Sequence, residues 1–563
     1  MAEARTLPAI RRWLPQYQRT WLKSDSVSGA TVAAVMIPSA LSYAAIVGVE
    51  PIVGLYTVPF ALVAYAIFGG SRLLAVGPDA AVSVLAASTI AGVATGDDYV
   101  EVMLALSLLV GGVYVVFSAM QMGWIADLVP NSVLKGFIQG LVWVTILGQI
   151  PALVGVTPEE DFPDFWRDVG ALVGVLGDVQ AETALLGVGS IVVLVVLKRF
   201  VPRIPGSLVV LVGSMVIVAA ASLADSGVAV VGEPEGGFFN FGLPSGLAGN
   251  QWIDLLPGAI AIVVLGFTES MGAAKSAAAT TGERLDPNEE LLALGASNLG
   301  SGLAGGYAVT GTLSKTSVAM SSGGKTQVGN LVAALIAVLS IVVLRPLFEE
   351  LASTVLAALI IFAMAGMLDI RYFVRLWHIS RTEFALAVVT FLGVLTFGVL
   401  PGVAIGVALA LVILVDHIGR PGSFVLGRAP DGTWRDIETV PDAVTTDGLV
   451  VYRQETPVVF LNARRISDRL RELATDDVEV IVLDASAIAS IDSTGFDSLS
   501  TLRVELEERG IEIWTVNPSI RKSKLIDHEA EVLDSNLPTR FQSHDDALEA
   551  FRTRSGPGPS DGG

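Results

Sequence analysis

Long apolar runs alternate with short polar connections up to about residue 420, where the pattern changes. Each run holds close to the roughly 20 residues that a helix needs to cross the hydrocarbon core of a bilayer. The spacing predicts about fourteen spanning segments, at 26–46, 52–69, 80–94, 102–121, 132–150, 182–199, 206–224, 257–275, 288–304, 313–322, 328–345, 352–368, 382–399 and 402–418.

Composition agrees with a protein embedded in a membrane. Of 563 residues, 52% are hydrophobic and only 16% are charged, and the mean hydropathy is +0.65. A soluble protein carries roughly 25% charged residues. The chain has no cysteine, which excludes disulfides and thiolate chemistry. The predicted class is therefore a polytopic α-helical membrane protein, with the lipid bilayer as its surroundings.

The distribution of lysine and arginine predicts the orientation. If the basic segment 1–25 is cytoplasmic and the spanning segments alternate, the opposite side holds only Arg167 and Arg345. This asymmetry follows the positive-inside rule. It predicts a multi-pass protein of the cell inner (plasma) membrane with both termini in the cytoplasm. The cytoplasmic connections then contain Arg72, Lys135, Lys198, Arg199, Arg203, Lys275, Arg284, Lys325, Arg371, Arg375, Arg381 and Arg420.

Two segments are too short and too interrupted to cross a bilayer, namely "LLAVGPDAAVSVLAA" (73–87) and "GYAVTGTLSKTSVAM" (306–320). Each combines an extended, β-prone start, a glycine-containing break and a short helical pattern, and each falls third in a group of seven segments. Matching interruptions are typical of inverted repeats with a binding site near the membrane midplane. We therefore expect two inverted seven-segment repeats, at about 26–224 and 257–418.

Beyond residue 420 the chain is polar and alternates between strand and helix patterns. Its 26 acidic and 15 basic residues do not favour nucleic acid as a partner. The alternation indicates a cytoplasmic α/β domain at 440–552, after a transport region at 26–420 and a linker at 421–439, and before a disordered tail at 553–563. The predicted strands are 456–463, 478–486 and 511–517, and the predicted helices are 464–475 and 492–510.

Glu269, in "GFTESMGAAKSAA", is a carboxylate inside a predicted spanning segment. Charged groups at that depth are costly and are functional by default. Beside an anion, an ionised carboxylate repels it, and protonation removes the repulsion, so that binding of H⁺ and of an anion become linked. The alternative is a structural ion pair with Lys275 or Lys315.

Lys315 lies in the first turn of the second interrupted segment. A lysine there opposes the helix dipole unless an anion is near, whereas free N–H groups and a lysine together form an anion site. The alternative is that its stem extends the ammonium to the surface. In the first interrupted segment, Asp79 is expected to cap the helix, and the free N–H groups of Ala80 and Ala81 are expected to face a substrate.

Two further regions carry polar groups whose role can be structural or functional. Ser39 and Tyr43 share a helix face just after Pro38, where the helix should bend, and they either bind substrate or pack against neighbouring helices. In the cytoplasmic region, "IDSTGFDSL" contains a strand-to-helix turn, where Asp492 or Ser493 is expected to cap the helix and Ser493 is a candidate regulatory phosphosite. No P-loop, GxSxG, HExxH or metal-ligand motif is present, so the sequence does not predict an enzyme.

Together these segments resemble the sulfate permease (SulP) family of anion transporters. "IPSALSYAAIVGVEPIVGLYT" (37–57), "AVGPDAAVSV", "AVTGTLSKTSVA" and "TESMGAAK" are similar to its membrane motifs. Residues 440–552, with "DSTG", resemble its C-terminal domain shared with anti-sigma-factor antagonists (STAS), whose matching serine, here Ser493, is phosphorylated in the antagonists.

The resemblance implies a fold like that of the uracil permeases, with core and gate domains, and a homodimer. It implies that the substrate site is lined by Ser39, Tyr43, Ala80, Glu269, Ser314 and Lys315. Family members often have Gln where this chain has Ser39. Glu269 stands where proton-coupled members have Glu, whereas sodium-coupled bicarbonate members tend to have Asp nearby.

The predicted function is secondary active transport of a small anion, with proton-coupled sulfate uptake by alternating access as the first choice. No cofactor is expected apart from H⁺ as the coupling ion, with Na⁺ as the alternative. Other interpretations are a Na⁺-coupled bicarbonate or a dicarboxylate symporter, an anion exchanger or channel, and a membrane scaffold whose STAS domain binds a cytoplasmic regulatory protein.

Overall fold

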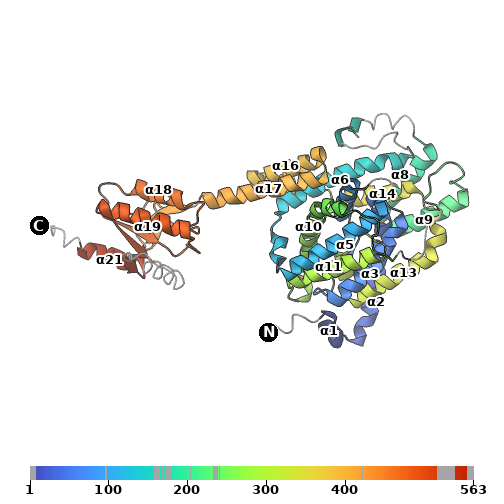
Figure 1. The fold of residues 1–563 in the computed structure, drawn as a ribbon, viewed down its shortest axis with the longest axis horizontal. Helices are drawn as coiled ribbons and strands as arrows, with labels where there is room; N and C mark the ends of the chain where they lie inside the picture. Colours follow the sequence, from blue (N-terminus) through green and yellow to red (C-terminus); the bar gives the residue numbers. More distant parts are fainter. Residues whose placement is uncertain are drawn as a thin grey trace. The chain divides into compact units, whose positions relative to one another are not determined.

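Most of the chain is helical in the computed structural model, which describes residues 8–94, 98–156, 165–167, 169–170, 179–202, 204–232, 239, 241–420, 422–516 and 539–554. Contacts divide it into two compact units, Met1–Ala410 and Leu411–Gly563 (Figure 1). The first unit is a helical bundle, and the second contains a sheet with helices.

The first unit repeats one order of elements. A short helix, α1 (Ile10–Trp13), precedes the first series, which is α2 (Leu22–Val47), α3 (Pro51–Phe68), β1 (Val76–Gly77), α4 (Ala80–Ala91), α5 (Tyr99–Ala119), α6 (Asn131–Val154), α8 (Ala181–Phe200) and α9 (Gly206–Ala221). The second series is α10 (Gly249–Thr281), α11 (Pro287–Leu303), β2 (Thr310–Gly311), α12 (Leu313–Ser321), α13 (Val328–Phe348), α14 (Ser353–Ala365), α16 (Arg381–Phe397) and α17 (Val399–Gly419).

Each of the fourteen segments predicted from the apolar runs overlaps one of these helices. The helix α15 (Ile370–Ile379) is additional; it carries both charged and aromatic residues and lies between α14 and α16. In the part of the chain that the structure describes, eight helical stretches are long and apolar enough to cross a membrane. The number of crossings therefore stays a prediction, while the helical membrane architecture is confirmed.

The two interrupted segments meet each other. Strands β1 and β2 form an antiparallel pair, in which Val76 faces Gly311 and Gly77 faces Thr310. The pairing satisfies backbone groups of extended chain inside the bundle, which is a condition for irregular backbone at membrane depth. Each strand leads directly into a short helix, α4 or α12, so the predicted plan of both segments is confirmed.

The helices pack as two bundles. Helices α2–α5 and α10–α13 contact one another extensively and are called the half-helix bundle below. Helices α6, α8, α9, α14 and α16 form a second group, the flanking bundle, centred on contacts of α6 with α14 and α16. The bundles touch mainly where α2 meets α14 and α9. They correspond to the core and gate domains expected from the sequence.

The crossing of α2 and α3 depends on a glycine. A Cβ atom on Gly54 would collide with the backbone carbonyl of Ala40, whereas Gly112, on α5, has open space around the same position. Small residues allow this close approach of helices in membranes. We expect Gly54→Ala to lower the free energy of unfolding by about 2–3 kcal/mol, and Gly112→Ala to leave it unchanged or slightly raised. The thermal unfolding midpoint in detergent measures both, and equal midpoints for the two variants would contradict the close packing.

The second unit contains a six-stranded sheet in the order β4-β3-β5-β6-β7-β8. Strands β5 to β8 are parallel, and β3 is antiparallel to both of its neighbours. Two helices, α18 and α19, share an apolar core with one face, and α21 packs on the other. The bounds are β3 (Ser423–Arg428), β4 (Trp434–Asp436), β5 (Leu449–Gln454), α18 (Ala463–Leu473), β6 (Val480–Asp484), α19 (Ser493–Glu508), β7 (Glu512–Val516), β8 (Thr539–Phe541) and α21 (His544–Arg554).

Two local predictions for this unit are wrong. The expected linker, 421–439, contains strands β3 and β4, because Phe424 and Leu426 join the apolar core under α21. The strand expected at 456–463 is reduced to one parallel bridge, between Val458 and Ile491, and a turn in which Asn462 Oδ1 accepts from the N–H of Val459 at 2.9 Å. The strand itself lies earlier, at β5. Of the expected disordered tail, 553–563, the first two residues belong to α21, which ends at Arg554. Residues 555–563 lie outside the described residues.

Asp484, at the end of β6, anchors the start of α21. Its Oδ2 lies 3.0 Å from His544 Nε2, and its Oδ1 accepts from the N–H of Ser486 at 2.9 Å. Burial alone would raise the pKa of Asp484, but the contacts with His544 and Ser486 outweigh burial and lower the pKa to about 2. Because the folded-state pKa lies below the ordinary value, the stabilisation is present above about pH 4 and is lost as the pH falls towards 2.

We expect Asp484→Asn to reduce the stability of the second unit at pH 7 by about 2 kcal/mol and to make it less dependent on pH between 4 and 2. Asp476, an exposed residue of the loop before β6, is a matched control. Thermal unfolding of the full-length protein at several pH values measures the effect. If Asp476→Asn changed the pH profile as much as Asp484→Asn, the assignment to Asp484 would fail.

Candidate functional site

The pairing of β1 with β2 brings the N-terminal ends of two short helices into one region. Helix α4 starts at Ala80 and helix α12 starts at Leu313, each directly after its strand. Among the described residues, no acceptor is bonded to the backbone N–H groups of Ala80, Leu313 and Ser314. Unpaired N–H groups at a helix start carry partial positive charge. Two such ends therefore open into the interior of the first unit.

Lys315 links the two short helices. Its side chain is only 2% exposed, and its Nζ donates to the carbonyl of Pro78, ahead of α4, at 2.5 Å. The same Nζ lies 5.6 Å from the centre of the Tyr43 ring, on α2. A cation over an aromatic face is favourable, more so when it is shielded from water. The ammonium stays inside the bundle, so the alternative in which Lys315 extends to the surface is wrong.

Glu269, on α10, forms no ion pair with any residue that the structure describes. Lys275, one of the two partners considered, pairs with Asp127 at 3.2 Å. Lys315 donates to Pro78, and the described residues include no ion pair of Glu269 with either lysine. The carboxylate lines a cavity instead. A charge placed inside a helical bundle without a fixed partner is expected to have a functional role.

The start of α4 differs in part from the prediction. Asp79 is the helix cap, as expected, and its Oδ2 accepts from the N–H of Ala81 at 2.8 Å. The N–H of Ala81 is therefore not free, and its predicted contact with substrate through that group is wrong. The cause is the strong preference of Asp for the cap position. Asp79 borders the cavity, whereas Ala80 and Ala81 are buried and are not among its lining residues.

The cavity lies between the two bundles and has a volume of about 700 Å³. This volume suits a small ligand. The half-helix bundle contributes four predicted residues, Ser39, Tyr43, Ser314 and Lys315, together with Glu269 and Asp79. The flanking bundle contributes apolar residues of α14 and the charged pair Lys135 and Asp369. Five of the predicted site residues thus line one cavity, and their roles in binding and coupling stay predictions.

Two serine hydroxyl groups on α2 donate hydrogen bonds to backbone carbonyls of the same helix. Ser39 Oγ donates to the carbonyl of Met36 and Ser42 Oγ to that of Pro38, both at 2.9 Å. The helix continues through Pro38 from Leu22 to Val47. Both serines nevertheless line the cavity, so their oxygen lone pairs remain available there.

Several lining residues were missed by the sequence analysis. Ser42 and Ser317 lie three residues after Ser39 and Ser314, on the same helix faces, and that spacing could have identified them. Lys135 was used only to assign the orientation, and Asp369 lies in a connection. No local signal joins these two residues, which are 234 positions apart.

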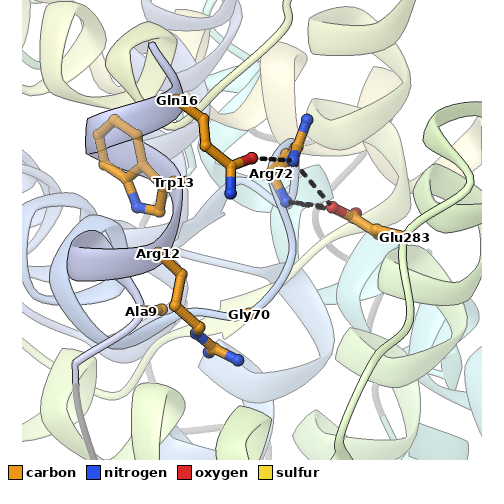
Figure 2. Close-up of a pocket in the computed structure, with 7 residues that line it drawn as sticks. All are labelled: Ala9, Arg12, Trp13, Gln16, Gly70, Arg72 and Glu283. Atoms are coloured by element: carbon orange, nitrogen blue, oxygen red, sulfur yellow. Dashed lines mark hydrogen bonds and ion pairs between the residues drawn. The ribbon is translucent and has the colours of Figure 1, made fainter. Parts of the chain in front are cut away.

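A second, smaller cavity, of about 140 Å³, lies beside the N-terminal segment (Figure 2). Arg72 donates to Gln16 Oε1 at 3.4 Å and lies 3.9 Å from Glu283, while Arg12 pairs with Glu289. Trp13 Nε1 donates to the carbonyl of Ala66 at 3.1 Å, which fixes α1 against the end of α3. Each arginine here is neutralised by its own carboxylate, so the cavity does not favour an anion. We interpret it as the place where the N-terminal segment packs against the bundle, and not as the candidate site.

Two further observations concern predicted sites outside the cavity. Ser493 is exposed at the start of α19, and Asp492 is the cap of that helix, with Oδ1 accepting from the N–H of Gly495 at 2.7 Å. Of the two capping residues considered, Asp492 and Ser493, the cap is Asp492, and phosphorylation of Ser493 stays a prediction. Within the described ranges, no three His, Asp or Glu residues are grouped so that they could hold a metal ion.

Comparison with known families gives two matches. The model of the sulfate permease family matches residues 22–390, and the model of the STAS domain matches residues 440–547. A probable sulfate transporter of Mycobacterium tuberculosis is 33% identical over 552 residues, covering 96% of this chain and 97% of that protein. The chloroplastic sulfate transporter 4.1 of Arabidopsis thaliana is 30% identical over 539 residues, covering 91% and 78%.

Two solved structures have similar folds. The murine Solute Carrier 26 family member A9, an anion transporter in the inward-facing state, has a TM-score of 0.89 and is 22% identical, covering 98% of this chain and 94% of its own. The transmembrane domain of the cyanobacterial bicarbonate transporter BicA has a TM-score of 0.60 at 22% identity, covering 70% and 98%. At these identities the likeness concerns the fold alone.

Proposed function

The chain belongs to the sulfate permease family, whose members are membrane transporters and not enzymes, and we propose that it is a proton-coupled secondary transporter that takes up sulfate. The observation that carries this proposal is the meeting of two helix starts and Lys315 at one cavity. Helix N-termini and a lysine favour an anion. Sulfate offers four acceptor oxygens, enough to engage several N–H donors and the ammonium together.

Proton coupling follows from the charge of Glu269 in the same cavity. An ionised carboxylate near the bound anion raises the free energy of the loaded site, and protonation removes that penalty. Each ligand then improves the binding of the other, which makes the coupling reciprocal. Asp79 adds a second carboxylate, but its Oδ2 is engaged by the N–H of Ala81. Glu269, without such a bond, is therefore the better proton carrier.

Transport proceeds by movement of the half-helix bundle against the flanking bundle, which exposes the cavity to one side of the membrane at a time. The limited contact between the bundles supports this mechanism. The transporter works as a homodimer in the inner membrane with both termini in the cytoplasm. Its STAS domain offers a surface for a cytoplasmic regulatory protein, and no cofactor other than the coupling ion takes part.

Uptake by the purified protein in liposomes tests the function. Labelled sulfate, bicarbonate, chloride and fumarate are each supplied with and without Na⁺ and with and without an inward H⁺ gradient. We expect sulfate to accumulate against its gradient when H⁺ flows inward, with no requirement for Na⁺. Na⁺-dependent accumulation of bicarbonate would favour the main alternative, and ion currents far above carrier turnover would indicate a channel.

A further inference from the structure

On the side of the flanking bundle, the cavity is lined by an ion pair. Lys135, on α6, places Nζ 3.1 Å from Asp369 Oδ2, in the connection between α14 and α15. Both side chains line the cavity that holds Glu269 and Lys315. Each is more than one third exposed, at 37% and 38%. The pair therefore stands where the cavity meets solvent, on the flanking bundle.

Asp369 is the rigid member of the pair. Its Oδ1 accepts from the N–H of Tyr372 at 3.2 Å, as the cap of α15. Its own N–H donates to Gln139 Oε1 at 3.5 Å, and Gln139 Nε2 donates to the carbonyl of Met367 at 3.1 Å. These bonds hold the connection after α14 against α6. The position of the carboxylate is thus set by the backbone and does not depend on Lys135.

Lys135 is the adaptable member. Its ammonium lies 5.6 Å from the centre of the Tyr372 ring and donates one hydrogen bond, to Asp369. An ammonium has three N–H donors, so two remain for other acceptors. An ion pair with this exposure contributes little to stability. A role in the path to the site explains its position better than a role in folding.

We infer that Lys135 is a contact for the transported anion between solvent and the short helices, and that Asp369 keeps that contact weak enough for release. The inference rests on the proposed transport of an anion through this cavity. A lysine at the mouth attracts anions and raises the rate of encounter. A lysine without a neighbouring carboxylate would also retain them, and transport needs binding that is favourable on entry and still reversible.

The absence of cysteine from the chain makes the charge at position 135 directly testable. Lys135→Cys is reconstituted and modified with a thiol reagent that adds either a positive or a negative group. We expect the variant to raise the KM for sulfate roughly three- to tenfold. We expect the positive reagent to restore it and the negative reagent to raise it further. Equal effects of both reagents, or an unchanged KM, would overturn the inference.

Asp369→Asn tests the second half of the inference. We expect a lower KM together with a lower maximal rate, because the anion is then held longer. The double variant Lys135→Gln with Asp369→Asn distinguishes an effect of the two charges on anion binding from a purely structural role of the pair. It keeps a hydrogen-bonding pair of similar shape without charge, so a KM and a maximal rate that both equal those of the unmodified protein would show that the pair is only structural. A KM that remains raised supports the inference.

Two controls complete the design. Arg375, on α15, lies 5.2 Å from the same Tyr372 ring but does not line the cavity, so Arg375→Cys and its modified forms should keep the original KM. Protection of the new thiol of Lys135→Cys by sulfate is measured without transport, and its absence would count against the contact. Failure of the unmodified protein to accumulate any of the four anions would overturn the proposed function instead.

Discussion

Replacement of Glu269 by glutamine is expected to abolish accumulation of the anion driven by a pH gradient, while exchange of anion across the membrane continues. Glutamine has nearly the shape of the protonated carboxyl group but carries no titratable proton. The site then accepts the anion at any pH, because the repulsion is permanently absent. We expect the accumulation ratio of the anion under a pH gradient to fall by roughly tenfold or more in this variant, which is the usual size of coupling between two ligands.

Uptake at external pH values from 5 to 8, with and without a gradient, measures this change. The sign is specific: in the unmodified protein sulfate uptake should rise as the external pH falls, and in Glu269→Gln it should be flat. Glu383→Gln is the matched control, because Glu383 lies in the first turn of α16 and does not line the cavity. If Glu269→Gln still accumulated sulfate in response to a pH gradient, Glu269 would not be the coupling group.

Replacement of Lys315 by methionine is expected to weaken sulfate binding by roughly 10- to 100-fold, the range for a lost hydrogen bond to a charged group. The ammonium is the buried positive charge at the meeting point of the short helices, and methionine keeps much of the side-chain volume without the charge. The loss should appear in the KM for sulfate and in a binding measurement on the detergent-solubilised protein.

The structure also shows a bond that this variant removes, from Lys315 Nζ to the carbonyl of Pro78. The unfolding midpoint must therefore be measured with the KM, so that a loss of folded protein is not mistaken for a loss of affinity. Lys275→Met is the control, because Lys275 is exposed and pairs with Asp127 away from the cavity. An unchanged KM in a folded Lys315→Met protein would rule out the anion site.

Much of the first unit was predictable because a bilayer admits few backbone structures. A run of about 20 apolar residues in lipid must satisfy its own hydrogen bonds, and a helix does so. The helix bounds therefore followed from hydropathy within several residues. The strands β1 and β2 were predictable for the opposite reason, since glycine and extended patterns interrupt the apolar runs at matching places.

The predictions that were wrong concern features that depend on contacts which the local sequence pattern does not reveal. The strand β3 was assigned to a linker because the sequence around it is polar and glycine-containing, while pairing with β4 and β5 and packing of Leu426 define it. The N–H of Ala81 was expected to be free, but the Asp79 side chain turned back on it. Neither outcome follows from the periodicity of the local sequence.

The sequence by itself determined the class of this protein, the ranges of its helices, the paired interruptions, and the presence of Glu269 and Lys315 at membrane depth, because the cost of burying charge and unpaired backbone in lipid restricts each of them. Only the tertiary structure decided what those groups face. It joined Lys315 to Pro78, left Glu269 without a fixed ion-pair partner among the described residues, and set Lys135 beside Asp369 across the cavity. Such contacts join elements far apart in the chain, and the packing of the two bundles selects them.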